Sequence, residues 1–242
     1  MGIFRGPNLV RDKLSLHLDA GSTRSFPGSG ADWFDLSVNK ITFSSYGTQT
    51  PHTTIGGVDC FDFNGSGYWQ SDSGHANVDF GGDCTLLFWF YAEDLTERDT
   101  FFEKAGTSYQ SYQQEIAVTL ETNEGFSYYS RRVDNYDHAG TSAMTIGEWN
   151  FMGIKMSTGK TTAARTGFYS KNGASWTSNY NSRSSQALTA AGAVRIGSGY
   201  AGAVENGYVS AVYCYNKMLS DAEVLQMYDA TKRRYGHWWV NL

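Results

Sequence analysis

The sequence of 242 residues has few prolines and few cysteines, and each shortage excludes a class of protein. Only 3 prolines stand beside 27 glycines, a balance that excludes collagen and Pro-rich disordered chains. An odd number of cysteines in a long chain argues against a disulfide framework, and the spacing of cysteines and histidines does not fit zinc. We therefore expect buried, reduced thiols at Cys60, Cys84 and Cys214.

Long apolar runs and an excess of positive charge are missing as well. No segment reaches the ~18 apolar residues of a membrane span, and the opening MGIFRGPNLVRDKL lacks the apolar centre of a signal peptide. The net charge of −5 argues against nucleic acid, whose phosphates require a clustered basic surface. The short basic runs Arg131-Arg132 and Lys232-Arg233-Arg234 are interpreted as solvated surface. The sequence thus predicts no nucleic-acid partner and no membrane partner.

Aromatic residues, at 15 % of the chain, favour pleated strands joined by glycine-dependent turns. The runs with strand character are KLSLHLD, VDCFDFN, CTLLFWFYAE, DTFFEK, QEIAVTL, GFSYYSRR, WNFMGIKM, TGFYSK, AVRIG and GYVSAVYCYN. Because these runs follow one another without intervening amphipathic helices, we expect an antiparallel sandwich rather than a parallel βαβ fold. Asn172-Gly173, between TGFYSK and ASWTSN, is typical of a two-residue hairpin turn.

One helix is predicted near the C-terminus, in LSDAEVLQMYDATKRRYG. Ser220 followed three residues later by Glu223 forms a capping box, in which each side chain satisfies a backbone N–H of the first turn. The helix should span residues 221 to 233 and bury Val224, Leu225 and Tyr228 on one face. We expect it to pack on the edge of the sandwich.

The stretch LSLHLD raises the question of an active site, because it places His17 two residues before Asp19. In a strand, alternate side chains point to opposite faces, so the pair would share one face and Leu14, Leu16 and Leu18 the other. A catalytic histidine and carboxylate would need a further group within reach, and none lies nearby in the sequence. The alternation therefore favours a strand face.

Three parts of the chain carry a resemblance to a known family. They are GPNLVRDKLSLHLDAGSTRSFPGSGADWFDLSVN, GGVDCFDFNGSGYWQ with CTLLFWFYAED, and IGSGYAGAVENGYVSAVYCYNKMLSDAEVLQMYDATKRRYG. Over residues 6 to 236 the chain resembles the laminin G-like, concanavalin A-like sandwich proteins of tailed bacteriophages. The resemblance implies an all-β, two-sheet antiparallel jelly roll over residues 13–236, with its first and last long strands near one another and one C-terminal helix. Residues 1–12 would form an N-terminal arm and residues 237–242 an apolar tail.

The resemblance also carries expectations for the two residues of LSLHLD. It implies that Asp19 is a structural residue at the junction of strand and loop, where its carboxylate accepts hydrogen bonds from loop N–H groups. His17 would then lie on the face opposite the leucines, between the sheets.

The function implied by the resemblance is that of a non-enzymatic virion component, namely a head decoration, fibre or tail protein. Made in the host cytoplasm, it would be exposed on the particle as a homo-oligomer. Its partners would be other phage virion proteins and host surface glycans. Two alternatives stay open: a glycan-cleaving enzyme of the same fold, and a purely structural cement or fibre protein without a ligand.

The enzyme alternative can be weighed on one stretch of sequence. Retaining β-glucanases of this fold carry Glu-x-Asp-x-Glu on one strand, which brings two glutamates close enough for a covalent mechanism. The nearest match is EIAVTLE, in which Ala117 takes the place of the middle Asp and Glu121 lies too far from Glu115. We interpret this stretch as an ordinary amphipathic strand and assign no catalytic residue.

Glycan recognition requires aromatic rings beside planar hydrogen-bonding groups. Residues 106–114, 131–140 and 198–207 have this mixture, although a packed subunit contact would look the same. The candidate glycan-binding residues are Tyr109, Tyr112, Asn135, Tyr136, Asp137 and Tyr200.

No cofactor is required by this hypothesis, and calcium is the one candidate, because laminin G-like relatives often bind it. The candidates by residue type are Asp62, Asn64, Asp72, Asp134 and Asp137, with Asp134 and Asp137 taken as the metal site. No EF-hand spacing supports any of them, and solvated loop acids are the simpler interpretation.

Both ends of the chain carry large apolar side chains. Phe4 in GIFRGPNL and Trp238 and Trp239 in HWWVNL would each gain about 1.5–3 kcal/mol from burial. The sequence predicts that they anchor the protein to a neighbouring subunit or to the particle. The alternative is that they fold back and seal the bottom of the sandwich.

Overall fold

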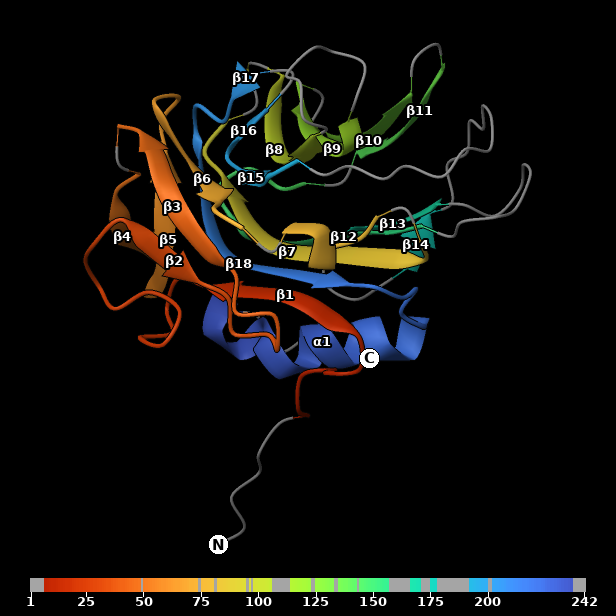
Figure 1. Ribbon diagram of the computed structural model, residues 1–242, viewed down its shortest axis with the longest axis horizontal. Helices are drawn as coiled ribbons and strands as arrows, with labels where there is room; N and C mark the ends of the chain where they lie inside the picture. The colour runs from red at the N-terminus through yellow and green to blue at the C-terminus, as the bar shows by residue number, and fades with distance from the viewer. Residues whose placement is uncertain are drawn as a thin grey trace, which may run out of the picture.

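The computed structural model describes residues 7–48, 50–73, 75–80, 82–94, 96, 98–105, 114–122, 125–132, 135–142, 144–156, 166–170, 175–177, 192–199 and 202–236. Of residues 105, 114–115, 125–132, 135–142, 156, 166–170, 175–177 and 202 it describes the backbone alone. Two large antiparallel sheets pack face to face, and one helix lies beneath the lower sheet in Figure 1. The predicted all-β antiparallel sandwich with one C-terminal helix is confirmed.

The sheet next to the helix is called sheet A, and its strand order is β14-β13-β12-β7-β18-β5-β4, with β1 paired to β18. Its strands are β1 (Leu14–Asp19), β4 (His52–Ile55), β5 (Val58–Phe63), β7 (Cys84–Ala92), β12 (Trp149–Met156), β13 (Thr166–Ser170), β14 (Ser175–Thr177) and β18 (Gly207–Tyr215). The pairing of β1 with β18 confirms that the first and last long strands are neighbours. β13 and β14 pair as the expected hairpin, whose turn lies outside the described residues.

The opposite sheet, sheet B, has the order β11-β10-β9-β8-β15-β6-β3-β2. Its strands are β2 (Asp32–Phe34), β3 (Thr42–Gly47), β6 (Gly67–Ser71), β8 (Asp99–Ala105), β9 (Gln114–Glu121), β10 (Gly125–Arg132), β11 (Asn135–Ser142) and β15 (Val194–Ile196). The short strands β16 (Ser198–Gly199) and β17 (Gly202–Ala203) form a separate ribbon, and η1 (His75–Asn77) is a 3-10 turn. All ten runs predicted to be strands form strands.

The core between the sheets is rich in aromatic residues. Trp33 from sheet B, Phe61 from sheet A and Trp69 from sheet B are fully buried, and their ring centroids lie 4.7–5.8 Å apart. Such edge-to-face contacts add about 0.5–1.5 kcal/mol per pair to the burial of the rings themselves. Because each sheet contributes one apolar face to this layer, the sandwich is held together mainly by apolar burial.

The cysteines bear out their prediction. Cys60, Cys84 and Cys214 are free and buried, with Cys84 and Cys214 in the core between the sheets. Burial raises the pKa of the Cys60 thiol to about 12 and that of Cys214 well above its ordinary value. The thiols of Cys60 and Cys214 are therefore protonated in the folded protein, and all three cysteines are shielded from solvent.

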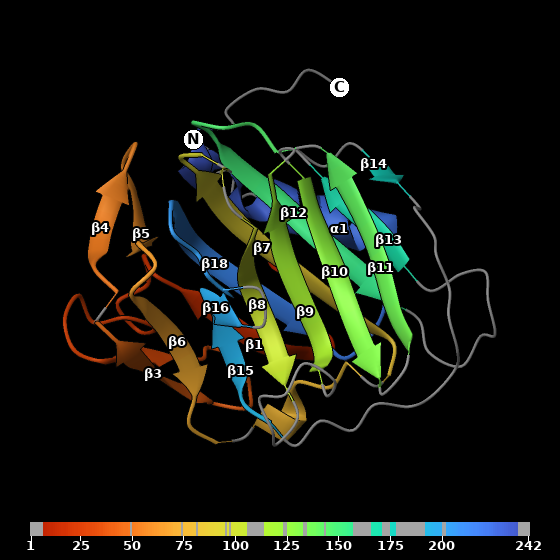
Figure 2. The same ribbon diagram turned by 90° about the horizontal axis from the view of Figure 1, so that it is seen from above.

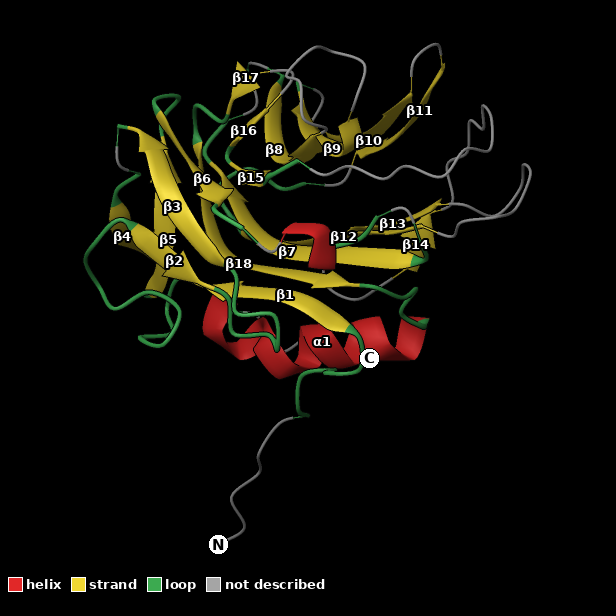
Figure 3. Cartoon of the chain, viewed as in Figure 1, coloured by secondary structure: helices red, strands yellow, loops and turns green. Residues whose placement is uncertain are grey.

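The helix α1 (Asp221–Thr231) covers the outer face of sheet A, so the expectation that it packs on the sandwich edge is wrong (Figure 3). A second apolar layer lies between the helix and sheet A. This layer includes the rings of Tyr235 and Trp89, whose centroids are 3.8 Å apart with an interplanar angle of 8°. Sheet A carries large apolar side chains on both faces, as the nearly continuous burial of β7 and β18 shows. The helix shields the second of these faces from water.

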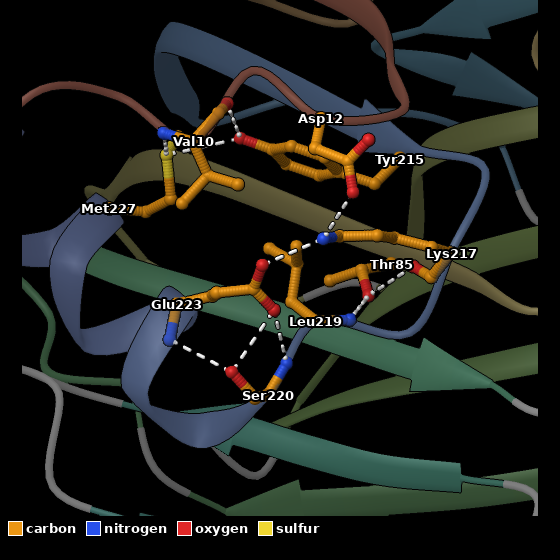
Figure 4. Close-up of polar contacts among 9 residues, drawn as sticks. All are labelled: Val10, Asp12, Thr85, Tyr215, Lys217, Leu219, Ser220, Glu223 and Met227. Carbon is orange, nitrogen blue, oxygen red and sulfur yellow. Dashed lines mark hydrogen bonds and ion pairs between the residues drawn. The ribbon is translucent and has the colours of Figure 1, made fainter.

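The helix begins at the predicted capping box, with Ser220 Oγ and Glu223 each bonded to the other's backbone N–H (Figure 4). It ends at Thr231 rather than at 233, and a 3-10 turn, η2 (Lys232–Tyr235), follows. Val224 and Tyr228 are buried as predicted, but Leu225 is 37 % exposed. Met227 is buried in its place, because the apolar stripe runs along the other side of Val224.

The described part of the N-terminal arm packs against this helix (Figure 4). The Val10 N–H lies 3.2 Å from the Met227 sulfur, and the Tyr215 hydroxyl donates to the Val10 carbonyl at 3.0 Å. Lys217 forms ion pairs with Asp12 at 2.9 Å and with Glu223 at 2.7 Å. The arm and the helix therefore form one layer on sheet A.

The alternation predicted for the leucines of LSLHLD is broken by an irregularity in β1. The register with β18 shifts between Leu14 and Leu16, so Leu16 and Leu18 enter the core between the sheets while Leu14 packs on the helix side. His17 points away from the core between the sheets and stacks on Tyr213 at 4.8 Å. The expectation that His17 lies between the sheets is therefore wrong.

Within the described ranges, no helical segment has the length and apolarity needed to cross a bilayer.

Candidate functional site

The outer face of sheet B carries a row of polar side chains on neighbouring strands. Figure 2 views the molecule from this side, with α1 behind the sheets. Backbone pairing places the members of the row directly opposite one another, strand by strand: Asp32 on β2, Ser44 on β3, Gln70 on β6, Arg195 on β15 and Glu103 on β8. Strand alternation explains the row, because the residues next to these positions, such as Phe43 and Trp69, point into the core.

An aromatic stack stands beside this row, and we call Tyr46, Tyr68 and Arg195 the tyrosine–arginine stack. Tyr46 on β3 and Tyr68 on β6 are directly opposite, and their rings stack at 5.6 Å with an interplanar angle of 11°. The Arg195 guanidinium carbon lies 5.2 Å from the centroid of the Tyr68 ring, and its Nε donates to Gln70 Oε1 at 2.8 Å. Tyr46 at the end of the stack is 40 % exposed.

The loop before β2 runs beside the end of β3 and contains a glycine with a positive φ. The Ser45 N–H donates to the Ala31 carbonyl at 2.9 Å, and continuing this antiparallel register places Gly30 beside Tyr46. Gly30 has a φ of +111°, and a Cβ built on it would meet nothing within 4 Å.

Two exposed carboxylates flank the stack on the same face. Ser44 Oγ donates to Asp72 Oδ2 at 2.8 Å and lies 3.5 Å from Asp32 Oδ1. The Asp72 backbone N–H donates to the Thr42 carbonyl at 2.9 Å, which holds the start of that loop against β3. Glu103, by contrast, is buried, because Gly199 of β16 lies over it, so close that an added Cβ would come within 2.9 Å of the carboxylate.

The six predicted glycan-binding residues fall into two groups of three. Tyr109, Tyr112 and Tyr200 lie outside the described residues. Asn135, Tyr136 and Asp137 begin β11, at the edge of sheet B opposite β2, and their side chains are outside the description. These assignments stay predictions. The assembly residues Phe4, Trp238 and Trp239 also lie outside the described residues.

Sequence reasoning missed the tyrosine–arginine stack. The runs TFSSYG and GYWQS do alternate between inward aromatic and outward polar positions, which is a signal for half-buried strands. What the sequence did not supply was the register that sets Tyr46 against Tyr68.

The pair His17 and Asp19 forms part of a structural network. Asp19 accepts a hydrogen bond from the Gly21 N–H at 3.0 Å, which confirms its predicted role at the end of β1. It also forms an ion pair with Arg234 of η2, so the interpretation of the C-terminal basic run as solvated surface is wrong for Arg234. The side chains of Arg131 and Arg132 are outside the description.

Ser210 has a hydroxyl bonded to several polar groups, as a catalytic serine would, but it is fully buried. Its Oγ donates to the Asp59 carbonyl at 2.8 Å and accepts from Arg234 Nη2 at 2.9 Å and from the Tyr235 hydroxyl at 3.1 Å. Burial lowers the pKa of His17 below its ordinary value, against the opposing effect of the nearby carboxylates. The hydrogen bonds of Ser210 fasten η2 to sheet A, and because this hydroxyl is buried it is not an accessible nucleophile.

The described side chains do not form a calcium site. Among them, no group of three or more histidine, cysteine or acidic residues lies close enough together to hold a metal ion. Asn64 Oδ1 accepts from Ser66 Oγ at 2.5 Å, and Asp72 accepts from Ser44. Burial, and then the charge of Glu93, raise the pKa of the Asp62 carboxyl. Asp134 is outside the described residues, as is the Asp137 side chain, so that metal assignment stays a prediction.

The EIAVTLE segment forms strand β9, as predicted. Glu121 accepts from Thr119 Oγ1 at 2.7 Å and pairs with Arg98 at 3.3 Å, while Ala117 is buried. At ~3.3 Å per residue, Glu115 and Glu121 are separated by about 20 Å along the strand, far beyond the ~5.5 Å of a retaining carboxylate pair. The strand therefore does not bring its two glutamates together for that chemistry.

Comparisons with known proteins give a fold relationship. No family model matches the chain, and no curated protein matches its sequence. Among solved structures, it is similar to the receptor-binding domain of botulinum neurotoxin C/D mosaic serotype, with a TM-score of 0.66 and 12 % identity over 90 % of this chain. It is also similar to the binding domain of botulinum neurotoxin DC in complex with SialylT, with a TM-score of 0.62 and 12 % identity over 91 % of this chain.

A sialidase of Trypanosoma rangeli is a third structural neighbour, with a TM-score of 0.61 and 12 % identity over 92 % of this chain. The chain spans 51 % and 52 % of the two toxin chains and 33 % of the sialidase chain. At this identity the likeness establishes the β-sandwich fold alone.

Proposed function

We propose that this protein is a glycan-binding component of a bacteriophage particle and that it binds sugar at the tyrosine–arginine stack. The single observation that carries the proposal is the exposed Tyr46 ring, stacked on Tyr68 and set among hydrogen-bonding side chains. A pyranose ring has an apolar C–H face and a rim of hydroxyls, and it needs an aromatic surface next to polar groups.

The geometry of the stack supplies both requirements. The Tyr68 ring and the Arg195 guanidinium brace Tyr46 from one side, which limits the rotamer entropy that would otherwise be lost on binding. Ser44 and Asp72 stand on the same face with hydroxyl and carboxylate oxygens that accept hydrogen bonds from sugar hydroxyls. The stack lies on a rigid pair of strands rather than on a long loop, so the site is formed before the ligand arrives.

The structural neighbours support the glycan part of the proposal. Two of them are named as receptor-binding or binding domains of neurotoxins, one in a complex with SialylT, and the third is named a sialidase. A fold of this type is thus compatible with sugar ligands, although function depends on the particular site.

The virion part of the proposal is supported by the sequence resemblance over residues 6 to 236. The β1–β18 pairing and the helix after the last strand agree with what that resemblance implies for the fold. As a homo-oligomer bound to other phage virion proteins, the protein would present several weak sites at once, and linked sites gain about 10² to 10⁴ in overall avidity. Localisation to the virion and host glycans as partners follow from the same proposal.

We propose binding without catalysis, because Glu115 and Glu121 of β9, the acid pair offered by the glucanase comparison, lie about 20 Å apart along the strand. Glu103 is covered by β16, whereas Asp32 and Asp72 flank a serine on the surface. Release of reducing sugar from host envelope polysaccharide that Glu115→Gln abolishes would favour the glycan-cleaving alternative instead.

The test is a glycan array probed with the full-length protein and with the Tyr46→Ala variant. Loss of the stacked ring should weaken binding by about tenfold to a hundredfold, since one buried aromatic contact is worth about 1.5–3 kcal/mol. Ile146→Ala is the matched control, because Ile146 is equally exposed, at 41 %, but lies in the segment before β12. Failure to bind any glycan, or equal binding by Tyr46→Ala, would contradict the proposed site.

A further inference from the structure

We propose that the tyrosine–arginine stack selects uncharged glycans and discriminates against glycans that carry a carboxylate, such as sialylated ones. This inference rests on the proposed function and concerns the ligand class of the same site. It follows from where the charges of the patch lie and from what the one arginine is already bonded to.

The arginine of the patch is engaged by its own neighbours. Arg195 Nε donates to the Gln70 side chain at 2.8 Å, and the guanidinium lies against the Tyr68 ring at 5.2 Å. Backbone pairing also sets Arg195 directly opposite Glu103, whose carboxylate is buried on the same face. A guanidinium that is stacked and bonded in this way braces the tyrosines, and we assign Arg195 as a positioning residue rather than a carboxylate receptor.

Two exposed negative charges stand beside Tyr46 among the described side chains. Asp32 and Asp72 are both exposed and converge on Ser44, next to Tyr46 along β3. Arg195 lies two strands away from Ser44 in the row and is paired with Glu103 on its other side, so the described side chains give the Tyr46 end of the patch an acidic balance. A ligand carboxylate bound over Tyr46 would therefore meet like charge, which costs affinity most at low salt.

The hydrogen-bonding character of the patch favours the same ligands. Carboxylate oxygens only accept hydrogen bonds, and sugar hydroxyls can donate to them. A sugar carboxylate has no proton to donate at neutral pH, so it would displace water from Asp32 and Asp72 without supplying a hydrogen-bond donor in its place. Neutral hexose and N-acetylhexosamine rings avoid both penalties.

The experiment uses an array of neutral oligosaccharides, each printed beside its sialylated counterpart, followed by calorimetric titration of the best neutral ligand and its sialylated form. In 20 mM salt the neutral ligand should bind about threefold to fivefold more tightly, and the difference should shrink at high salt. The double variant Asp32→Asn with Asp72→Asn should reduce the preference to less than about twofold. Glu148→Gln, which removes an exposed negative charge elsewhere, should leave the preference unchanged.

The possible outcomes separate the two proposals. Equal or tighter binding of sialylated glycans that still depends on Tyr46 overturns the charge selection and leaves the proposed function standing. A preference that Glu148→Gln alters as much as the double variant does also overturns it, because the effect would then come from net charge. Absence of binding to every glycan, or binding independent of Tyr46, overturns the proposed function itself.

Discussion

Arg234, in the last turn after the helix, forms an ion pair with Asp19, at the end of the first strand. The two residues are 215 positions apart in the sequence. The same guanidinium donates to Ser210 Oγ at 2.9 Å and to the Asp59 carbonyl at 3.2 Å. One side chain thus ties the C-terminal segment to three strands of sheet A, namely β1, β5 and β18.

We predict that Arg234→Ala lowers the free energy of unfolding by about 1.5–3 kcal/mol, because Asp19 loses its ion-pair partner and Ser210 Oγ and the Asp59 carbonyl each lose one hydrogen-bond donor. The pair is about a quarter exposed, so the loss should stay below that of a fully buried pair. Urea unfolding followed by tryptophan fluorescence measures the change. Arg233→Ala, an exposed neighbour, should change stability by less than about 0.5 kcal/mol, and an equal loss in both variants would contradict the clamp.

The capping box offers a second test of how the helix is held. Ser220→Ala should cost about 1 kcal/mol, because the Glu223 N–H at the start of α1 loses its acceptor. Ser220→Thr keeps the hydroxyl and should retain most of that stability. Thermal unfolding of the three proteins ranks them, and a Thr variant as unstable as the Ala variant would argue against capping.

The pH dependence of stability should report on His17. Its pKa is lowered by burial in the folded state, so the unfolded chain binds the proton more readily, and stability is lost as the pH falls through about 6.5. We predict that the free energy of unfolding falls between pH 7.5 and 5, and that His17→Phe, which keeps a ring against Tyr213, falls less.

The comparison of wild type with variant isolates His17 from other groups. Glu223, whose pKa is lowered by its hydrogen bond to Lys217, loses its contribution only at a pH below the ordinary value of about 4.5. Denaturant unfolding at pH 7.5, 6.5 and 5 gives the slopes. Identical slopes in both proteins would show that His17 does not titrate differently on folding.

The three thiols should be unreactive in the folded protein. Cys60, Cys84 and Cys214 are buried, and the raised pKa values of Cys60 and Cys214 disfavour the thiolate that attacks a disulfide reagent. Ellman's reagent should label none of them at pH 8 and all three in guanidinium chloride. Reducing agent should leave the melting temperature unchanged. A mass lower by two hydrogens in the untreated protein would reveal a disulfide instead.

The apolar ends provide the test of assembly. We predict that deletion of residues 237 to 242 prevents assembly while the melting temperature of the monomer stays within a few degrees. Sedimentation velocity measures the oligomeric state, and calorimetry measures the melting temperature. A truncated monomer that unfolds much earlier, yet still assembles in its folded fraction, would show that Trp238 and Trp239 seal the sandwich instead.

The sequence by itself determined those features that depend on neighbours along the chain. Short apolar and aromatic runs such as CTLLFWFYAE predicted strands, and the Ser220–Glu223 spacing predicted the start of the helix. The family resemblance also implied the structural role of Asp19, whose bond to the Gly21 N–H spans only two residues. Local hydrogen bonds and side-chain periodicity involve residues only a few positions apart, so they can be predicted from the sequence without knowing which distant segments pack together.

Only the tertiary structure decided which faces meet. The place of α1 on sheet A depends on the second apolar face of that sheet. A strand that is buried on both faces has a continuous apolar sequence, so its sequence does not show which face meets the helix. The bulge in β1 moved Leu14 to the helix side, although nothing in LSLHLD distinguishes it from Leu16. Arg234 belongs to a basic run that the sequence alone predicts to be solvent-exposed. The ion pair with Asp19 exists only because the fold brings the two residues together.

The candidate site belongs to the same second group. Tyr46, Tyr68 and Arg195 come from three strands, and their stack exists because β3 and β15 both pair with β6 in one particular register. A shift of one residue in either pairing would send alternate side chains to the other face and separate the rings. Register is set by the packing of Phe43, Trp69 and Ile196 on the inner face, which no single strand contains. The sequence therefore specified the strands, whereas packing between the sheets assembled the site.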